Sequence, residues 1–258
     1  MIFDILGKPA HGDTGGAALD PGRPASVFIH GAMNDHTVWR QQLDALAHEG
    51  GNVLALDLPG HGRSAGPALG TVEAMAGWVL AALDAAGIVE ARLIGHSMGS
   101  LIALQASLQA PGRVKALALL GATVPMNVSD ALLASARADE AAAIEMVAQW
   151  SHVPDSPARA QSAELMRSMA GRGLLHGDLD ACRRYANGEA AARAVACPTL
   201  LVIGSKDRMT PPKSTALLTG ALAHATVVRV EAGHQMMAEQ PEAVTNALRQ
   251  LANCSARV

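Results

Sequence analysis

The sequence predicts an α/β protein with a doubly wound, mostly parallel sheet, and three observations support this. Six short apolar runs recur along the 258 residues. Most of them lack strict apolar–polar alternation, which is typical of strands covered on both faces. Segments with helical spacing separate the runs, and such β–α alternation favours a parallel sheet. Half of the residues are hydrophobic and only 2% are aromatic, so aliphatic side chains are expected to fill the core.

The predicted elements follow one another in a regular order along the chain. Buried strands are expected at residues 25–31, 51–57, 91–97, 114–121, 198–204 and 225–231. Helices are expected at residues 37–49, 71–86, 98–110, 211–222 and 241–252. Pro211, Pro212 and Pro241 fit the first turns of the last two helices, where a missing N–H costs nothing.

One segment, residues 125–195, interrupts the alternation. It contains no convincing strand, and the stretches at 129–150 and 156–171 have helical spacing. A connection of about 70 residues is too long for an ordinary loop, and its apolar content favours an ordered helical cap. We therefore expect a core in two parts, residues 1–124 and 196–258, with a helical cap or lid at 125–195.

Composition excludes several classes of protein. The net charge is −3 and basic residues do not cluster, so neither nucleic acid nor a membrane surface is an expected partner. No apolar run approaches the ~20 residues that span a bilayer, and the N-terminus lacks a signal-like pattern. Cys182, Cys197 and Cys254 are widely spaced and no metal-binding motif occurs, so we expect no disulfide framework and no metal. These features favour a cytoplasmic protein.

The stretch "LIGHSMGSLIAL" at residues 93–104 contains the pattern Gly-x-Ser-x-Gly centred on Ser97. A strand is predicted before it and a helix after it, which is the context that a nucleophile elbow requires. Gly95 and Gly99 are then explained sterically, because strand and helix approach each other closely at such a turn. Ser97 is the candidate nucleophile. The alternative is a Gly-Ser turn before a helix, with no catalytic role.

A serine hydroxyl needs a general base that a third group orients. His234 follows the last predicted strand, and Asp207 follows the strand before it. The carboxyl ends of parallel strands meet at one edge of the sheet, so Ser97, Asp207 and His234 are expected to converge there as nucleophile, acid and base. Asp130 is the alternative carboxylate.

Two backbone amides are expected to stabilise the oxyanion of an acyl-transfer reaction. In an elbow, one donor is the N–H of the residue after the nucleophile, which here is Met98. The second is expected in the loop after the first long strand. There "FIHGAMND" contains a His-Gly turn, and the amide of Ala32 is our candidate.

These segments resemble the α/β-hydrolase fold superfamily. The resemblance rests on "HGAMNDHTVW", "DLPGHGRS" at 57–64, "GHSMGS", the aspartate of "GSKD" and "AGHQMMAEQPEAV", and it covers residues 20–122 and 196–252. It is closest to small bacterial esterases, lactonases, haloperoxidase-like enzymes and C–C bond hydrolases. It implies the triad and oxyanion amides named above, and structural roles for Asp57 and Arg63. The helical cap, which we expect after strand six, matches no pattern of the family. The short segment before residue 25 departs from the pattern, so the usual first hairpin is expected to be abbreviated.

The substrate is expected to lie between the sheet edge and the cap. Six side chains are expected to border it: Met33, Met126, Met146, Trp150, Met236 and Met237. No arginine is convincingly placed to bind a carboxylate, although Arg183, Arg184 and Arg208 are candidates, so a neutral, moderately apolar ester with a short acyl group is favoured. No cofactor is needed for this chemistry, and the oligomeric state stays open. The alternatives are a C–C bond hydrolase or enol-lactonase with the same triad, a cofactor-free peroxidase-like activity, and a ligand receptor with little turnover.

Overall fold

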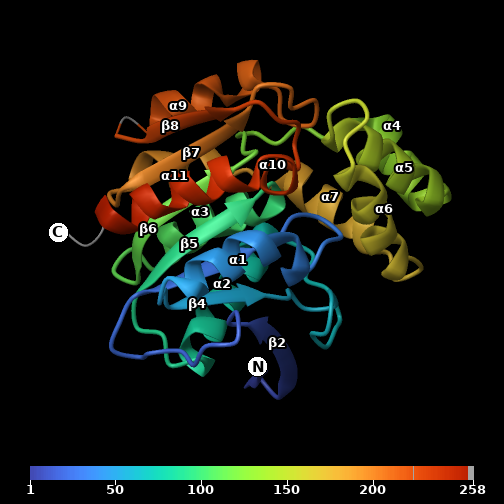
Figure 1. Ribbon diagram of the computed structural model, residues 1–258. Coiled ribbons are helices and arrows are strands. Elements are labelled where there is room, and N and C mark those ends of the chain that lie inside the picture. The colour runs from blue at the N-terminus through green and yellow to red at the C-terminus, as the bar shows by residue number, and fades with distance from the viewer. Residues whose placement is uncertain (223, 255–258) are drawn as a thin grey trace.

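The computed structural model describes residues 1–222 and 224–254 and confirms the predicted α/β fold (Figure 1). Eight strands form one sheet in the order β1-β2-β4-β3-β5-β6-β7-β8. The strands are β1 (Ile2–Ile5), β2 (Lys8–Asp13), β3 (Ala25–Ile29), β4 (Val53–Leu56), β5 (Ala91–His96), β6 (Val114–Leu120), β7 (Thr199–Gly204) and β8 (Thr226–Val230). The pairs from β4 through β8 are parallel, so the loops after these strands emerge at one edge.

The N-terminal hairpin, which was expected to be abbreviated, is present as two short strands, β1 and β2. β1 pairs with β2 in antiparallel fashion, and β2 pairs with β4. The strand β2 reads "KPAHGD", which is neither an apolar run nor an alternating one. Sequence pattern therefore gave no signal for it, although its residues Ala10 and His11 are buried.

Helices cover both faces of the sheet. One face carries α1 (Arg40–His48), preceded by the 3₁₀ turn η1 (His36–Trp39), and α11 (Pro241–Cys254), preceded by α10 (Met236–Glu239). The other face carries α2 (Val72–Ala85) and α3 (Met98–Gln109), with α9 (Ala216–Ala221) following the 3₁₀ turn η2 (Pro212–Thr215). Successive strand residues point to opposite faces, and in β3 the side chains of Val27 and Ile29 join the core under α2 and α3 while Phe28 joins the core under α1 and α11.

Five helices lie between β6 and β7, where the sequence predicted a strand-free segment. They are α4 (Asp130–Ala138), α5 (Glu140–Ser151), α6 (Ala158–Ser168), α7 (Leu174–Arg184) and α8 (Gly188–Ala194). The single helix expected over 129–150 divides at Asp139, whose backbone is not helical and whose carboxylate caps α5 by accepting from the N–H of Ala142 at 3.0 Å. We refer to α4–α8 as the inserted helices.

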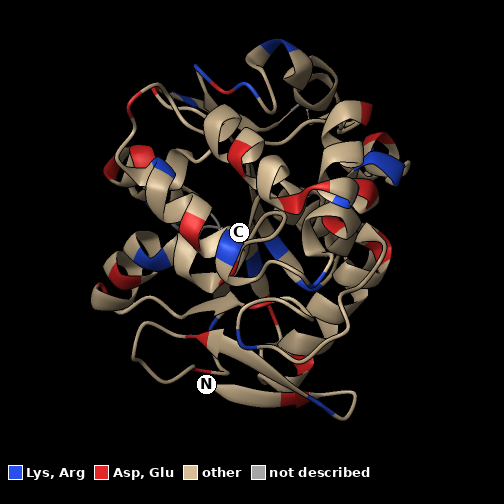
Figure 2. Cartoon of the chain, turned by 90° about the vertical axis from the view of Figure 1, so that its right-hand side faces the viewer, with Lys and Arg blue, Asp and Glu red and all other residues tan. Residues whose placement is uncertain are grey.

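The inserted helices α4–α7 pack beside the sheet, at the right of Figure 1. They form an apolar cluster of their own, which includes Leu133, Ile144 and Leu175 and extends to Met33 in the loop after β3. Lys and Arg are interspersed with Asp and Glu over this side of the molecule (Figure 2). Several pair locally, such as Arg184 with Asp180 at 2.8 Å.

Residues 255–258 of the last predicted core segment, and the side chain of Cys254, lie outside the described residues. Cys182 and Cys197 are free thiols. No helix within the described ranges is long and apolar enough to cross a membrane.

Candidate active site

Ser97 lies on a tight turn between β5 and α3, at the carboxyl end of the strand. Its backbone has φ 54° and ψ −118°, a conformation that non-glycine residues rarely adopt and that costs about 1–3 kcal/mol. The Ser97 N–H donates to the carbonyl of Leu120 on β6 at 2.9 Å, which ties the strained residue to the sheet. The turn therefore has the geometry of a nucleophile elbow.

The two glycines of the motif allow strand and helix to meet. A Cβ added at Gly95 would lie 2.1 Å from the carbonyl oxygen of Gly99, and one added at Gly99 would lie 2.2 Å from the carbonyl oxygen of Ile29. These contacts are with backbone atoms, which cannot move aside as a flexible side chain can. The steric explanation inferred from the sequence thus matches the geometry.

Asp207 and His234 are joined by a hydrogen bond at the same edge of the sheet. Asp207 follows β7 and His234 follows the neighbouring strand β8, and His234 Nδ1 lies 2.8 Å from Asp207 Oδ2. Both side chains are buried. Because Nδ1 is engaged with the carboxylate, Nε2 is the ring nitrogen left for proton exchange with a nucleophile.

Thr210, which the sequence analysis missed, completes this part of the site. Its hydroxyl donates to Asp207 Oδ2 at 2.7 Å and lies 3.3 Å from His234 Nδ1. The N–H groups of Met209 and Thr210 both donate to Asp207 Oδ1 at 2.8 Å. The Asp-x-x-Thr spacing in "KDRMT" is a turn pattern that could have indicated this arrangement.

The electrostatics of the pair follow from its partners. Burial would raise the pKa of Asp207, but the charge and hydrogen bond of His234 and the donors of Thr210 outweigh it, so this pKa lies below its ordinary value. His96 packs against His234 with ring centroids 4.6 Å apart and donates from Nε2 to the His234 carbonyl at 2.9 Å. Burial and the nearby His234 lower the pKa of His96 to about 3. The His96 ring that packs against His234 is therefore neutral.

The two amides proposed as oxyanion donors have no acceptor among the described residues. Met98 is the first residue of α3, and the first N–H groups of a helix have no partner within it. In the loop after β3, Met33 and Asn34 donate to Asp178 and to Gly31, whereas the N–H of Ala32, which precedes Met33, is unused. Both amides therefore remain available to a ligand.

One pocket of about 160 Å³ brings several predicted residues together. It is lined by Ser97, His234 and Ala32 from the core, and by Met126 and Trp150 from the inserted segment. It is also lined by residues that the sequence analysis did not name as pocket residues: Asn127, Val128, Ser129, Leu132, Leu179, Cys182, Met209 and Thr210. Arg208, which the sequence analysis considered, lines it too.

Four predicted pocket residues do not line this pocket. Met236 and Met237 belong to the core under α1 and α11, and Met33 is fully buried against the inserted helices. Met146 is half-buried and packs against that same cluster. Proximity in sequence to His234 or Ala32 placed three of them near the site, but the local backbone turns their side chains into the cores. Asp130, the alternative acid, is exposed and pairs with Arg183 at 2.7 Å.

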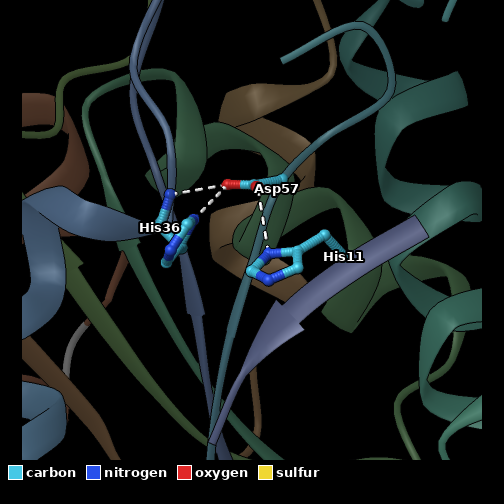
Figure 3. Close-up of side chains that lie close together, drawn as sticks. All are labelled: His11, His36 and Asp57. Carbon is cyan, nitrogen blue, oxygen red and sulfur yellow. Dashed lines mark hydrogen bonds and ion pairs between the residues drawn. The ribbon is translucent and has the colours of Figure 1, made fainter. Parts of the chain in front are cut away.

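Asp57, which follows β4, holds several loops together, in line with the structural role that the resemblance implied (Figure 3). Its Oδ1 accepts from the N–H and Nδ1 of His36 at 2.8 and 2.7 Å, and Oδ2 accepts from the Arg63 N–H at 2.9 Å and from His11 Nδ1 at 3.1 Å. Two histidines and a carboxylate can also bind a cation. Here each carboxylate oxygen already accepts two hydrogen bonds, and the Arg63 guanidinium lies 3.5 Å from His11 Nε2, so we assign the cluster to bracing.

Comparison with known proteins agrees with the α/β fold described above. The family model described as the alpha/beta hydrolase fold matches residues 24–143. A putative carbamate hydrolase, RutD, of Klebsiella pneumoniae is 30% identical over 227 residues, covering 83% of this chain and 85% of that protein. The dihydrolipoyllysine-residue acetyltransferase component of the acetoin cleaving system of Cupriavidus necator is 43% identical over 112 residues, but this chain spans only 29% of that protein.

A solved structure, that of a thermophilic esterase, has the same fold. It superimposes with a TM-score of 0.86 at 22% identity, covering 99% of this chain and 97% of the esterase. The eight-stranded, mostly parallel sheet and the serine on a strand–helix turn together place this chain in one class of α/β proteins. Within that class, this chain belongs to the alpha/beta hydrolase fold family.

Proposed function

We propose that this protein is a serine hydrolase that cleaves a carboxylic ester of a small substrate through an acyl-enzyme on Ser97. The observation that carries the proposal is a single pocket lined by Ser97, His234 and Ala32, with His234 bonded to Asp207 at 2.8 Å. Family membership supports hydrolysis as the reaction type. A carbamate, the substrate class in the name of the RutD relative, contains an acyl carbon as an ester does.

In the proposed mechanism, the Ser97 hydroxyl attacks the substrate carbonyl while His234 Nε2 takes its proton. Asp207 holds the ring through Nδ1 and stabilises the imidazolium that forms. The amides of Ala32 and Met98 donate to the oxyanion, and each such donor contributes roughly 10²–10³ in rate. The alcohol leaves with the proton from His234, and water then repeats the sequence on the acyl-enzyme.

The size of the pocket supports a substrate with a small acyl or alcohol group. Its volume of about 160 Å³ is below the ~300–1,000 Å³ of sites that hold drug-sized ligands. Met126, Leu132, Trp150 and Leu179 give it an apolar wall. All four side chains come from residues 125–195, so we propose that the inserted helices act as the lid of this site and that residues 1–124 and 196–258 form the hydrolase core.

The test is steady-state hydrolysis of p-nitrophenyl acetate, butyrate and octanoate by the full chain and two variants. Ser97→Ala is expected to lower kcat by about 10⁵–10⁶-fold, and Ser205→Ala, at an exposed loop serine, is expected to match the wild type. Acetate is expected to be cleaved faster than octanoate because the pocket is small. A wild type with negligible turnover on every ester would instead favour the ligand-receptor alternative.

A second candidate, a hydrolase of a carboxylate-bearing lactone or ester, is favoured by Arg208. Arg208 is exposed, lines the pocket and has no ion-pair partner within the described residues. By contrast, Arg183 pairs with Asp130, and Arg184 pairs with Asp180. A guanidinium binds a carboxylate through two parallel hydrogen bonds, so an arginine is available at the site despite our preference for a neutral ester.

Substitution of Arg208 separates the two candidates. If the substrate carries a carboxylate, Arg208→Gln is expected to lower kcat/KM for an enol-lactone carboxylate by about 10–100-fold, the worth of one charge-assisted contact. Hydrolysis of p-nitrophenyl acetate should not change. Arg183→Gln is the matched control. Equal rates of the wild type and Arg208→Gln on the lactone would exclude this candidate.

A further inference from the structure

The loop that carries the Ala32 amide is held by a buried carboxylate from the inserted helices. Asp178, on α7, has 1% of its surface exposed, and its Oδ2 accepts from the backbone N–H of Met33 at 2.8 Å. The same oxygen lies 2.9 Å from Nε2 of His61, which is also buried. Asp178 thus joins three segments that are far apart in the sequence.

The bonds around Ala32 fix both peptide planes that flank it. The Gly31 carbonyl, in the same peptide plane as the Ala32 N–H, accepts from His30 Nδ1 at 2.8 Å. In the next plane, the Ala32 carbonyl accepts from Asn34 Nδ2 at 3.0 Å, while the Met33 N–H donates to Asp178. Because peptide units are planar, fixing these groups fixes the direction of the free Ala32 N–H. Met33 itself has φ 48°, so the loop is held in a strained conformation.

The His61–Asp178 pair must hold a proton between its two members. His61 Nδ1 lies 3.0 Å from the Pro59 carbonyl, which only accepts, so Nδ1 carries a hydrogen. His61 Nε2 faces Asp178 Oδ2, and this contact needs one more proton, on Nε2 or on the carboxyl. Burial lowers the pKa of His61, but the charge and hydrogen bond of Asp178 outweigh this and raise it above the ordinary value.

The neighbouring His30, unlike His61, needs no additional proton for its hydrogen bonds. Its Nδ1 donates to Gly31, and its Nε2 accepts from the Leu58 N–H at 3.1 Å, so this ring is satisfied as the neutral form. Its centroid lies 5.0 Å from that of His61, and burial, together with His61, lowers its pKa to about 4. Of the two neighbouring rings, only His61 therefore takes part in a proton-sharing bond.

Asp178 is not explained as a contribution to stability alone. Its Oδ1 is buried and has no hydrogen-bond partner among the described residues, and a buried polar atom left unpaired costs about 1–3 kcal/mol. Apolar residues in place of a buried ion pair are often neutral or stabilising. Stability alone therefore does not account for a carboxylate at this position, and its contacts point to a role in positioning.

We propose that Asp178, supported by His61, is a positioning residue for catalysis: it anchors the oxyanion loop through the Met33 N–H and so makes the Ala32 amide dependent on the seating of α7. The inference rests on the proposed function of the Ser97 site. Asp178 does not line the pocket and acts through the loop. Displacement of α7 would release the loop, so the site would be complete only when the inserted helices are in place.

Kinetics of three α7 variants test this proposal. Asp178→Leu removes the anchor and leaves an apolar side chain of similar size. It is expected to lower kcat on p-nitrophenyl acetate by about 30–100-fold with KM within about threefold, because a mispositioned oxyanion donor weakens mainly the transition state. Asp178→Asn keeps an oxygen for the Met33 N–H but loses the charge, so it should restore part of the loss and leave kcat about three- to tenfold below the wild type. Asp180→Asn, a partly exposed residue on the same helix, is the control.

Inhibition by a trifluoromethyl ketone separates positioning from a purely structural role, because a purely structural role of Asp178 would leave the inhibition constant unchanged. It forms a tetrahedral adduct with the serine, so its inhibition constant should rise by the same factor as kcat/KM falls. Folded Asp178→Leu with kcat within threefold of the control overturns the proposal. If Asp178→Leu does not fold, Asp178→Asn decides: an unchanged kcat overturns the proposal, and a three- to tenfold lower kcat at constant KM supports it.

Nuclear magnetic resonance of the imidazole N–H groups tests the pair independently of turnover. At pH 7, wild-type His61 is expected to show Nδ1–H and a second strongly hydrogen-bonded proton shared with Asp178, and Asp178→Asn should lose the second. The absence of this second, strongly hydrogen-bonded proton in the wild type overturns the proposal. If the protein cleaves no ester at all, the proposed function fails while this spectrum still reports on the pair.

Discussion

Replacement of Asp207 by asparagine should disable His234 by fixing the wrong tautomer. Asp207 Oδ1 accepts from two backbone N–H groups at 2.8 Å, so the amide oxygen of the new asparagine side chain must occupy that side. Its NH₂ group then faces His234 Nδ1 and the Thr210 hydroxyl, which in the native site face an acceptor. His234 Nδ1 would have to accept, which places the ring proton on Nε2, where the nucleophile needs a base.

The expected loss is about 10³–10⁴-fold in kcat, close to the effect of the same change in the template Ser-His-Asp site, or about 4–5.5 kcal/mol of transition-state stabilisation. The assay is kcat and KM on p-nitrophenyl acetate at pH 7, with thermal unfolding to check the fold. Thr210→Val, which removes one hydroxyl and keeps the carboxylate, should lose about tenfold or less. Asp207→Asn with more than a tenth of wild-type kcat would refute the reasoning.

Three further predictions concern the turn, the core and the pocket. Gly95→Ala should destabilise the protein by more than about 3 kcal/mol or prevent folding, since its Cβ would meet the Gly99 carbonyl oxygen at 2.1 Å. The control Gly77→Ala, within α2, should be neutral or stabilising by up to about 1 kcal/mol. Equal denaturation midpoints of the two variants would contradict this prediction. Burial raises the pKa of Asp57, but His36 and the backbone donors outweigh this and lower it to about 2, so its stabilisation of about 2 kcal/mol is present above pH ~4 and lost as pH falls towards 2. The difference in unfolding free energy between the wild type and Asp57→Asn should shrink accordingly in urea titrations, and a difference independent of pH would be at odds with this pairing. Leu179→Ala should enlarge the pocket and shift the preference from acetate towards butyrate, whereas an unchanged chain-length profile would place the acyl group elsewhere.

The parallel sheet and the place of Ser97, Asp207 and His234 could be predicted because both depend on local pattern. Apolar runs mark buried strands, and parallel strands bring their carboxyl ends to one edge whatever the distance in sequence. The structure brings Asp207 and His234 into contact and places Ser97 in the same pocket as His234. Their catalytic roles remain predictions.

What the sequence could not predict depends on contacts between distant segments. Asp178 meets Met33, which is 145 positions away, and His61, which is 117 positions away, and no periodicity links them. Methionines raise a related difficulty: Met236 and Met126 have the same chemistry, yet one enters the core and the other lines the pocket. The polar strand β2 was missed because its pairing with β1 and β4, rather than its composition, makes it a strand.

The central claim is that Ser97 carries the acyl group, and trapping that intermediate tests it most directly. The wild-type protein would be mixed with p-nitrophenyl acetate, quenched in acid within milliseconds and digested for mass spectrometry. We predict one acetyl group on the peptide that contains Ser97, a burst of p-nitrophenol equal to the enzyme concentration, and neither signal in Ser97→Ala. An acetyl group on another residue, or ester turnover by Ser97→Ala at the wild-type rate, would contradict the proposed mechanism.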